Sequence, residues 1–245
     1  MAEFIAQVDA DLVCLQEVAL ASVDGSVVDQ PVLFGRLTGF DGRYGSVCPL
    51  PLVEPPPSGR IVGAYLWGNA ILSRNPILTT TTHALPVTPD DDPADPVDIE
   101  PRCALACQIA TPAGRVTVIS THLAHLGLRA RRHQAGRLAE IVTQTGGPVV
   151  LAGDLNAAIE QPELSELRPL LVDGFAAVGV GPGDARRESC GVDQIDHVLT
   201  RGFDIVECRV AREAGELSDH WPVVARLRLS DGAGSSGSAT AAGAG

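Results

Sequence analysis

The sequence predicts an α+β sandwich, in which β-sheets pack together and few helices interrupt the strands. Short apolar segments bounded by Gly, Pro, Asp and Ser recur along the chain, often two or three in succession. A doubly wound parallel sheet would instead require a helix after almost every strand. The 245 residues are 45% hydrophobic, enough for one large domain with a substantial core. We therefore assign residues 1–230 to a single domain.

The first third of the chain predicts two short helices and several strands. Apolar residues at helical spacing in 1–9 predict a helix, and the next segment, Leu12–Leu15, is typical of a strand. A second helix is expected around Val32–Leu37. Three short apolar segments then predict strands: Tyr44–Val47, Ala70–Ser73 and Ile77–Thr82.

The rest of the chain gives stronger local signals. Cys103–Ala110 and Arg115–Ser120 predict a hairpin, because a Thr-Pro-Ala-Gly turn lies between them. Leu128–Thr145 is the clearest helix, with apolar residues along one face. Leu85–Pro101, rich in proline and aspartate, is expected to be a solvated loop rather than a metal site. Later strands are predicted after Pro148 and at Ile195–Leu199, Ile205–Val210 and Pro222–Leu229.

Composition restricts the partners and the location. Asp231–Gly245 is almost entirely Gly, Ser and Ala, so we expect a disordered tail. The formal net charge is −12, and all 18 basic residues are arginines, so the overall field does not attract nucleic acid. The arginines of 129–137 are expected to be a solvated helix face. The absence of a transmembrane-length run or a basic leader indicates a cytoplasmic protein.

The six cysteines do not indicate a metal site. None of them forms a Cys-x-x-Cys pair. Cys103 and Cys107 share one face of a predicted strand, but no histidine lies near them in sequence. Buried free thiols are therefore favoured over zinc ligands.

Asp154 and Asn156 stand at the end of a buried apolar segment that begins after Pro148. The carboxyl ends of strands are where α/β folds place their chemistry. Side chains two residues apart on an extended chain point the same way, so we expect both groups to face one spot.

Four further apolar segments deliver polar residues in the same way. Each residue alone has an ordinary explanation: Glu17 as a surface carboxylate, His122 as a structural histidine, Asp196 as the partner of an arginine. Charged groups at the margin of a core cost stability unless they are paired or metal-bound, so five such clusters are hard to explain separately. The polar residues of the four segments are Glu17, His122, Asp196 and the pair Asp219–His220.

These side chains have compatible chemistry. Glu17 and Asp219 are hard oxygen donors of the kind that Mg²⁺ or Mn²⁺ prefers. Histidines beside carboxylates suit proton transfer and the stabilisation of negative charge. Asp154 and Asn156 could orient or deprotonate water. Together they predict metal-assisted hydrolysis of a phosphate ester. A serine hydrolase and a P-loop nucleotidase are disfavoured, because the chain has no Gly-x-Ser-x-Gly motif and no lysine.

Six short motifs together give the sequence a resemblance to a known family. The motifs LQEV, GNAILSR, STHL, GDLN, QIDHVL and SDHWPV occur in order between about residues 9 and 229. This set resembles the endonuclease/exonuclease/phosphatase family, and the combination of GDLN with SDH is its most specific part. The resemblance implies a four-layer αββα sandwich of two mainly antiparallel sheets, with the active site at one rim of the sheets.

The resemblance also implies roles for individual residues. Asp154 and Asn156 match the pair that positions the attacking water and contacts the phosphate, with Asp154 as general base. His220 matches the histidine that engages the scissile phosphate, and Asp196 the carboxylate that orients it. His122 matches a histidine that stabilises the phosphate or the leaving group.

Metal and substrate contacts follow in the same way. Glu17 matches the family's metal-binding glutamate, and Asp219 a metal-associated aspartate. Asn69 and Arg102 are candidates for substrate contacts. Family members normally begin with a strand that carries a metal-site asparagine. The chain starts inside the helix that would follow, so we expect that N-terminal strand to be missing.

The sequence therefore predicts a monomeric Mg²⁺- or Mn²⁺-dependent phosphodiesterase or phosphatase with no stable protein partner. A small phosphodiester or a phospholipid headgroup fits the acidic balance, and the nine aromatics offer few stacking platforms for bases. Endonuclease or exonuclease action on DNA is the nearest alternative. A second alternative is a catalytically impaired binding or scaffold protein, made so by the loss of the first strand.

Overall fold

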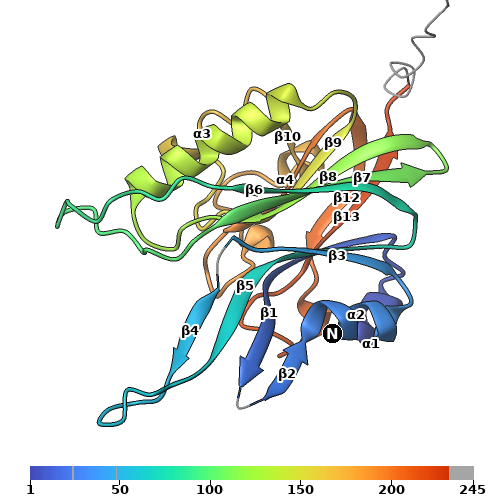
Figure 1. The fold of residues 1–245 in the computed structure, drawn as a ribbon. Helices are drawn as coiled ribbons and strands as arrows, with labels where there is room; N and C mark the ends of the chain where they lie inside the picture. The colour runs from blue at the N-terminus through green and yellow to red at the C-terminus, as the bar shows by residue number, and fades with distance from the viewer. Residues whose placement is uncertain (24, 48, 232–245) are drawn as a thin grey trace, which may run out of the picture.

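The computed structural model describes residues 1–23, 25–47 and 49–231; Asp24, Cys48 and 232–245 lie outside this range. The tail predicted to be disordered thus falls, apart from Asp231, outside the described residues. Figure 1 shows two facing sheets with helices on their outer sides. The long helix α3 (Leu128–Gln144) covers one sheet, and α1 (Ala2–Gln7) and α2 (Gln30–Thr38) flank the other. The predicted α+β sandwich is confirmed.

One sheet has six strands in the order β10-β11-β9-β8-β7-β6. All neighbours are antiparallel except β8 and β9, which run parallel. A parallel pair requires a crossover connection, and α3 supplies it. The strands are β6 (Ile77–Ala84), β7 (Cys103–Thr111), β8 (Gly114–His122), β9 (Val149–Asp154), β10 (Val172–Asp173) and β11 (Asp196–Arg201).

The second sheet is antiparallel and has the order β2-β1-β5-β3, with β4 also paired to β5. A separate antiparallel pair, β12 (Phe203–Val210) and β13 (Val223–Leu229), completes the described strands. The five strands of the second sheet are β1 (Leu12–Val23), β2 (Ser26–Asp29), β3 (Asp41–Gly45), β4 (Leu50–Val53) and β5 (Ile61–Ser73).

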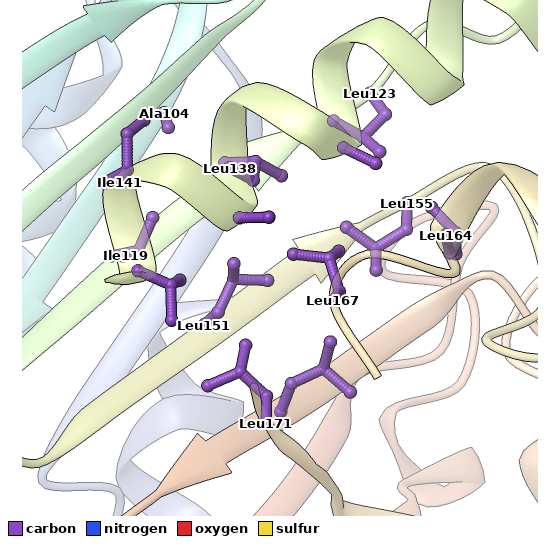
Figure 2. Packing of buried hydrophobic residues seen from close by; sticks show 14 of the residues in the cluster. Ala104, Ile119, Leu123, Leu138, Ile141, Leu151, Leu155, Leu164, Leu167 and Leu171 are labelled. Carbon is purple, nitrogen blue, oxygen red and sulfur yellow. The ribbon is translucent and has the colours of Figure 1, made fainter. Parts of the chain in front are cut away.

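Two apolar cores hold these layers together. Figure 2 shows the first, in which Leu138 and Ile141 of α3 face Ile119 and Leu151 of the six-stranded sheet. The second core lies on the opposite face of that sheet, where residues such as Val118 meet side chains of β1, β5, β12 and β13. The strands β7, β8, β9 and β11 of the six-stranded sheet are therefore buried on both faces, which accounts for their nearly continuous apolar sequences, whereas the edge strand β6 is mostly exposed.

Several elements are longer than the sequence predicts. The strand predicted at Leu12–Leu15 continues as β1 to Val23, and the one predicted at Ala70–Ser73 begins at Ile61 as β5. The added halves contain Ala, Ser, Gly and Trp without apolar alternation, and they are strands because they pair with each other. The short elements β2, β4, β10, α4 (Gly174–Ala177) and the 3₁₀ turns at 162–164, 185–187 and 212–214 were not predicted.

The aspartate-rich loop packs against the start of α3 rather than standing free in solvent. Asp95 accepts hydrogen bonds from the backbone N–H groups of Leu128 and Arg129 at 2.7 and 2.9 Å. A carboxylate at this position satisfies otherwise unpaired donors and complements the helix dipole. Part of the aspartate content of the loop is thus explained by helix capping.

Three of the four arginines of α3 pair with carboxylates, and the fourth, Arg132, is exposed. Arg129 pairs with Asp91 at 2.8 Å, Arg131 with Glu163 at 3.3 Å, and Arg137 with Glu140 at 2.7 Å. The expectation of a merely solvated face is therefore too simple, because these cations have carboxylate partners.

The cysteines agree with the expectation of free thiols. Cys103, Cys107 and Cys208 are buried and free, and Cys14 and Cys190 are half-buried and free. Cys48 lies outside the described residues. Among the described helices, none is long and apolar enough to cross a membrane.

Arg187 is the buried centre of an ionic cluster with Asp173 and Glu160. Its side chain is 1% exposed, and it contacts Asp173 at 2.8 Å and Glu160 at 3.3 Å. Its guanidinium also lies 5.2 Å from the centre of the Phe175 ring. The adjacent Arg186 is 67% exposed and pairs only locally with Asp184.

This contrast predicts different costs for neighbouring substitutions. Arg187→Ala should lower the free energy of unfolding by about 3–5 kcal/mol, because it leaves the largely buried carboxylate of Asp173 without its partner. Arg186→Ala should have a much smaller effect, since solvent already screens its ion pair. Denaturant unfolding of both variants measures this difference. Equal losses would contradict the structural role given to Arg187.

Candidate active site

Three strand ends of the six-stranded sheet place His122, Asp154 and Asp196 in one row. His122 is the last residue of β8 and lies beside Asp154, the last residue of the parallel strand β9. Asp196 is the first residue of the antiparallel β11 and pairs with Asp154 from the other side. Residues opposite one another on neighbouring strands project from the same face. The register alone therefore gathers three residues that are far apart in sequence.

Gly153 allows this close approach. Its φ is +150°, and a Cβ at this position would lie 1.9 Å from the backbone oxygen of Thr121 on β8. Only glycine tolerates such a contact together with this backbone conformation. The backbone contact thus explains why the GDLN motif has a glycine at this position: it lets β9 approach β8 closely enough to place Asp154 beside His122.

Asp154 is buried among groups that act on its charge. Its side chain is 8% exposed, and Oδ2 lies 3.3 Å from Nε2 of His122. Desolvation by burial and repulsion from Asp196 raise the pKa of Asp154 to about 7, despite a hydrogen bond from the backbone N–H of Asn156. The carboxyl can therefore exchange a proton near neutral pH, which is the property required of a general base.

Asn156 reaches the same place by a turn rather than by strand alternation. β9 ends at Asp154, and Asn156 has a φ of +51°, a left-handed conformation that asparagine tolerates. Its backbone N–H donates to Asp154 Oδ1 at 2.7 Å. Its carboxamide nitrogen lies 3.0 Å from both His122 Nε2 and the carbonyl oxygen of Leu123. The two residues of the motif do face one spot, although the geometry differs from the one expected.

His220 enters the site from the segment before β13. Its Nδ1 lies 2.8 Å from Oδ2 of Asp196, and this hydrogen bond is the main cause that raises the pKa of His220 to about 9. The imidazole is thus a cation at neutral pH. The segment is held in place because the backbone N–H of Trp221 donates to the backbone carbonyl oxygen of Ser189 at 2.7 Å. Arg212 also lies 4.5 Å from the centre of the indole ring.

His122 is kept neutral at one end of the row, beside Asp154. Burial, followed by the nearby charges of Arg102 and His220, holds the pKa of His122 well below its usual range. Its Nδ1 lies 3.9 Å from Oε1 of Glu17, so the ring stands between that carboxylate and Asp154. A neutral imidazole can both donate and accept a proton.

The sequence predicts that Glu17 follows the end of a strand, but the structure places it elsewhere. It lies within β1 at a bulge, where the pairing with β5 shifts between Leu15 and Val18. Its φ is +55°, and its side chain is 56% exposed. Bulges redirect side chains at sheet edges, and this one turns Glu17 toward His122.

The metal-ligand geometry selects a different set from the predicted one. Among the described residues, the side chains that could together hold a cation are Asp154, Asp196 and His220, whose ligand atoms lie within 4.8 Å of one another. Two carboxylates in a partly buried site suit a hard divalent ion, which would also relieve their mutual repulsion. Glu17 is not part of this group. Asp219 is exposed, and its Oδ1 accepts a hydrogen bond from Oγ of Ser218 at 3.1 Å. Their metal-binding roles stay predictions.

Asn69 and Arg102 are both buried, and Asn69 contacts the residue that follows Arg102. The Asn69 nitrogen donates to the backbone oxygen of Cys103, the residue after Arg102, at 2.9 Å. Arg102 is 6% exposed and pairs with Glu100 at 3.0 Å and Asp98 at 3.6 Å. Within the described part of the chain, Arg102 Nε and Nη1 and Asn69 Oδ1 are buried without a hydrogen-bond partner. Such unsatisfied groups are costly, and they are typical of a site that meets a ligand.

His125, which no sequence motif singled out, also contacts this network. Its Nδ1 lies 3.3 Å from Oδ1 of Asn156. The only sequence signal was its place three residues after His122, in an otherwise apolar segment.

A sequence model of the endonuclease/exonuclease/phosphatase family matches residues 1–220. No curated protein matches the chain. Among the solved structures, an endonuclease/exonuclease/phosphatase from Beutenbergia cavernae is 27% identical, with a TM-score of 0.69. That match covers 94% of this chain and 65% of the other, so the chain spans less than two thirds of that protein.

Two more distant structures share the fold. The human nocturnin catalytic domain with bound sulfate is 17% identical, with a TM-score of 0.67 over 93% of this chain and 84% of that one. TDP2 from D. rerio, complexed with a single-strand DNA product, is 14% identical, with a TM-score of 0.65 over 93% and 89%. The family of the matching model comprises hydrolytic phosphoesterases and nucleases. Because the family model spans almost the whole described chain, this protein belongs to the endonuclease/exonuclease/phosphatase family.

Proposed function

We propose that the protein is a divalent-metal-dependent hydrolase of phosphate esters, acting first on phosphodiesters. The observation that carries this proposal is the row of His122, Asp154 and Asp196, closed by the ion pair between Asp196 and His220. It combines a base that titrates near neutral pH, a neutral imidazole and a fixed cation in one place. In-line attack of water on a phosphate needs these three functions.

Each side chain has a distinct task in this proposal. Asp154 accepts the proton of the attacking water, and Asn156 holds both Asp154 and His122 in position through its backbone and its carboxamide. His220, kept protonated by Asp196, stabilises negative charge on the phosphate. His122, neutral and buried, donates a hydrogen bond to the phosphate or to the leaving oxygen.

Mg²⁺ or Mn²⁺ is the proposed cofactor. Asp196 offers a carboxylate oxygen to it, with Glu17 as a further candidate ligand on the other side of His122, while Asp154 keeps the role of base. When bound, such an ion supplies Lewis-acid polarisation of the phosphate oxygens.

The charge distribution favours a small substrate over a long nucleic acid. Three of the arginines on α3 are already paired with carboxylates, and the net charge is −12. A nuclease must neutralise several phosphates along its substrate. A small phosphodiester or a phospholipid headgroup therefore fits better. DNA cleavage is the nearest alternative, motivated by the single-strand DNA product in the D. rerio TDP2 structure.

Hydrolysis of bis(p-nitrophenyl) phosphate tests the proposed function. We expect turnover with Mg²⁺ or Mn²⁺, its loss in EDTA, and a decrease of at least about 100-fold in Asp154→Asn and His220→Asn. Asp91→Asn is the matched control, because that carboxylate pairs with Arg129 away from the site. Activity that survives EDTA, or that is unchanged in both site variants, would sink the mechanism.

The same assay separates the alternatives. Metal-dependent nicking of plasmid DNA without turnover of small diesters would favour the nuclease. Absence of turnover on every substrate, with the fold intact, would support the catalytically impaired protein.

Arg102 is the proposed phosphate anchor, because its Nε and Nη1 are buried and lack partners among the described residues. Arg102→Lys should weaken inhibition by inorganic phosphate by about tenfold or more, since lysine keeps the charge but not the planar fork of donors. Arg74→Lys, at an exposed ion pair with Asp9 and Asp11, is the control. An unchanged inhibition constant in Arg102→Lys would show that the phosphate binds elsewhere.

A further inference from the structure

His125 lies just beyond the end of β8, on the rim of the site. Its residue is exposed, whereas His122 and Asp154 are buried. Its ring nitrogen Nδ1 lies 3.3 Å from the carboxamide oxygen of Asn156. An exposed histidine is unremarkable by itself, so its significance depends on what this contact does to Asn156.

The hydrogen bonds of Asn156 fix the direction of its carboxamide. One end of the amide lies 3.0 Å from the carbonyl oxygen of Leu123, which can only accept, so that end must be the nitrogen. The carboxamide oxygen therefore faces His125. Because this oxygen is an acceptor, the contact is a hydrogen bond only if His125 carries its proton on Nδ1. The Nε2 atom is then left unprotonated in the neutral ring.

The backbone of His125 is held on both sides by charged groups. Its N–H donates to Oδ2 of Asp98 at 2.7 Å, and its carbonyl oxygen accepts from Nη1 of Arg131 at 2.9 Å. Arg131 is itself anchored by the buried Glu163 at 3.3 Å. Hydrogen bonds to ionised groups are roughly twice as strong as neutral ones. Two charged side chains thus fix the backbone of His125, although its imidazole is exposed.

We infer that His125 is a positioning residue, whose Nδ1–H holds the Asn156 carboxamide in the orientation that keeps its nitrogen on His122. The carboxamide nitrogen lies 3.0 Å from His122 Nε2, and the backbone N–H of Asn156 binds Asp154 at 2.7 Å. Loss of the oxygen's partner frees the amide to rotate and weakens its contact with His122, whereas the backbone bond to Asp154 stays. The kinetic consequence rests on the proposed function, whereas the hydrogen bond itself does not.

Two substitutions separate the two ring nitrogens. In His125→Asn the amide nitrogen occupies nearly the place of Nδ1, whereas in His125→Gln it lies nearer the place of Nε2. With bis(p-nitrophenyl) phosphate we expect His125→Asn to keep kcat within about twofold and His125→Gln to lose about tenfold, the usual cost of removing an orienting partner. KM should change less than about twofold in both, and thermal unfolding should match the unsubstituted protein because the side chain is exposed.

Two kinetic results would overturn this inference. Equal kcat values in His125→Asn and His125→Gln would show that the Nδ1 donor is irrelevant. A loss confined to diesters with poorer leaving groups, such as a phenyl ester, would show that the imidazole protonates the leaving oxygen instead of orienting Asn156.

Nitrogen NMR of the metal-free protein provides a readout that does not need activity. At pH 8 the His125 ring should be protonated on Nδ1, and His125→Gln should shift the side-chain NH₂ signals of Asn156 while His125→Asn restores them. An Nε2-protonated ring, with Asn156 signals unchanged in His125→Gln, would refute the inference. If the protein gives the expected NMR result but hydrolyses no phosphate ester, the inferred hydrogen bond from His125 to Asn156 is supported and the proposed function is contradicted.

Discussion

The hydrogen-bonded register of β8, β9 and β11 is the constraint on which the candidate site depends. It pairs His122 with Asp154 and Asp154 with Asp196, so the three side chains meet without any loop having to place them. A slip of one residue in either pairing would turn the central carboxylate to the opposite face. The cores on both faces of the sheet prevent such a slip, because each would then bury polar groups.

Burial gives this row its chemistry. Two carboxylates that face one another in a partly buried site repel, and the structure offsets that repulsion on one side only, where Asp196 pairs with His220. The pKa of Asp154 therefore rises to about 7, while that of His220 rises to about 9. Neighbouring groups with pKa values pushed apart in this way are how a fold assigns acid and base roles. The same repulsion makes the place between the carboxylates attractive to a cation.

The α+β class and most strands could be predicted from the sequence, because β7, β8, β9 and β11 of the six-stranded sheet are buried on both faces and are apolar runs. The second half of β1 could not, since its pairing with β5 rather than its own pattern makes it a strand. The motifs identified His122, Asp154 and Asp196 by type, but not that Glu17 lies on a bulge or that Asp219 is exposed. His125 could not be found, because its significance comes from a contact with Asn156 across the turn.

The electrostatic coupling between Asp154 and Asp196 is the most direct consequence of the register. Carbon-13 NMR titration of the Asp154 carboxyl in the metal-free protein measures it. The account predicts a pKa of about 7 for Asp154 and a lower value in the Asp196→Asn variant, because that substitution removes the neighbouring negative charge. An Asp154 pKa in the ordinary range for aspartate, unchanged by Asp196→Asn, would show that the two carboxylates do not share a site.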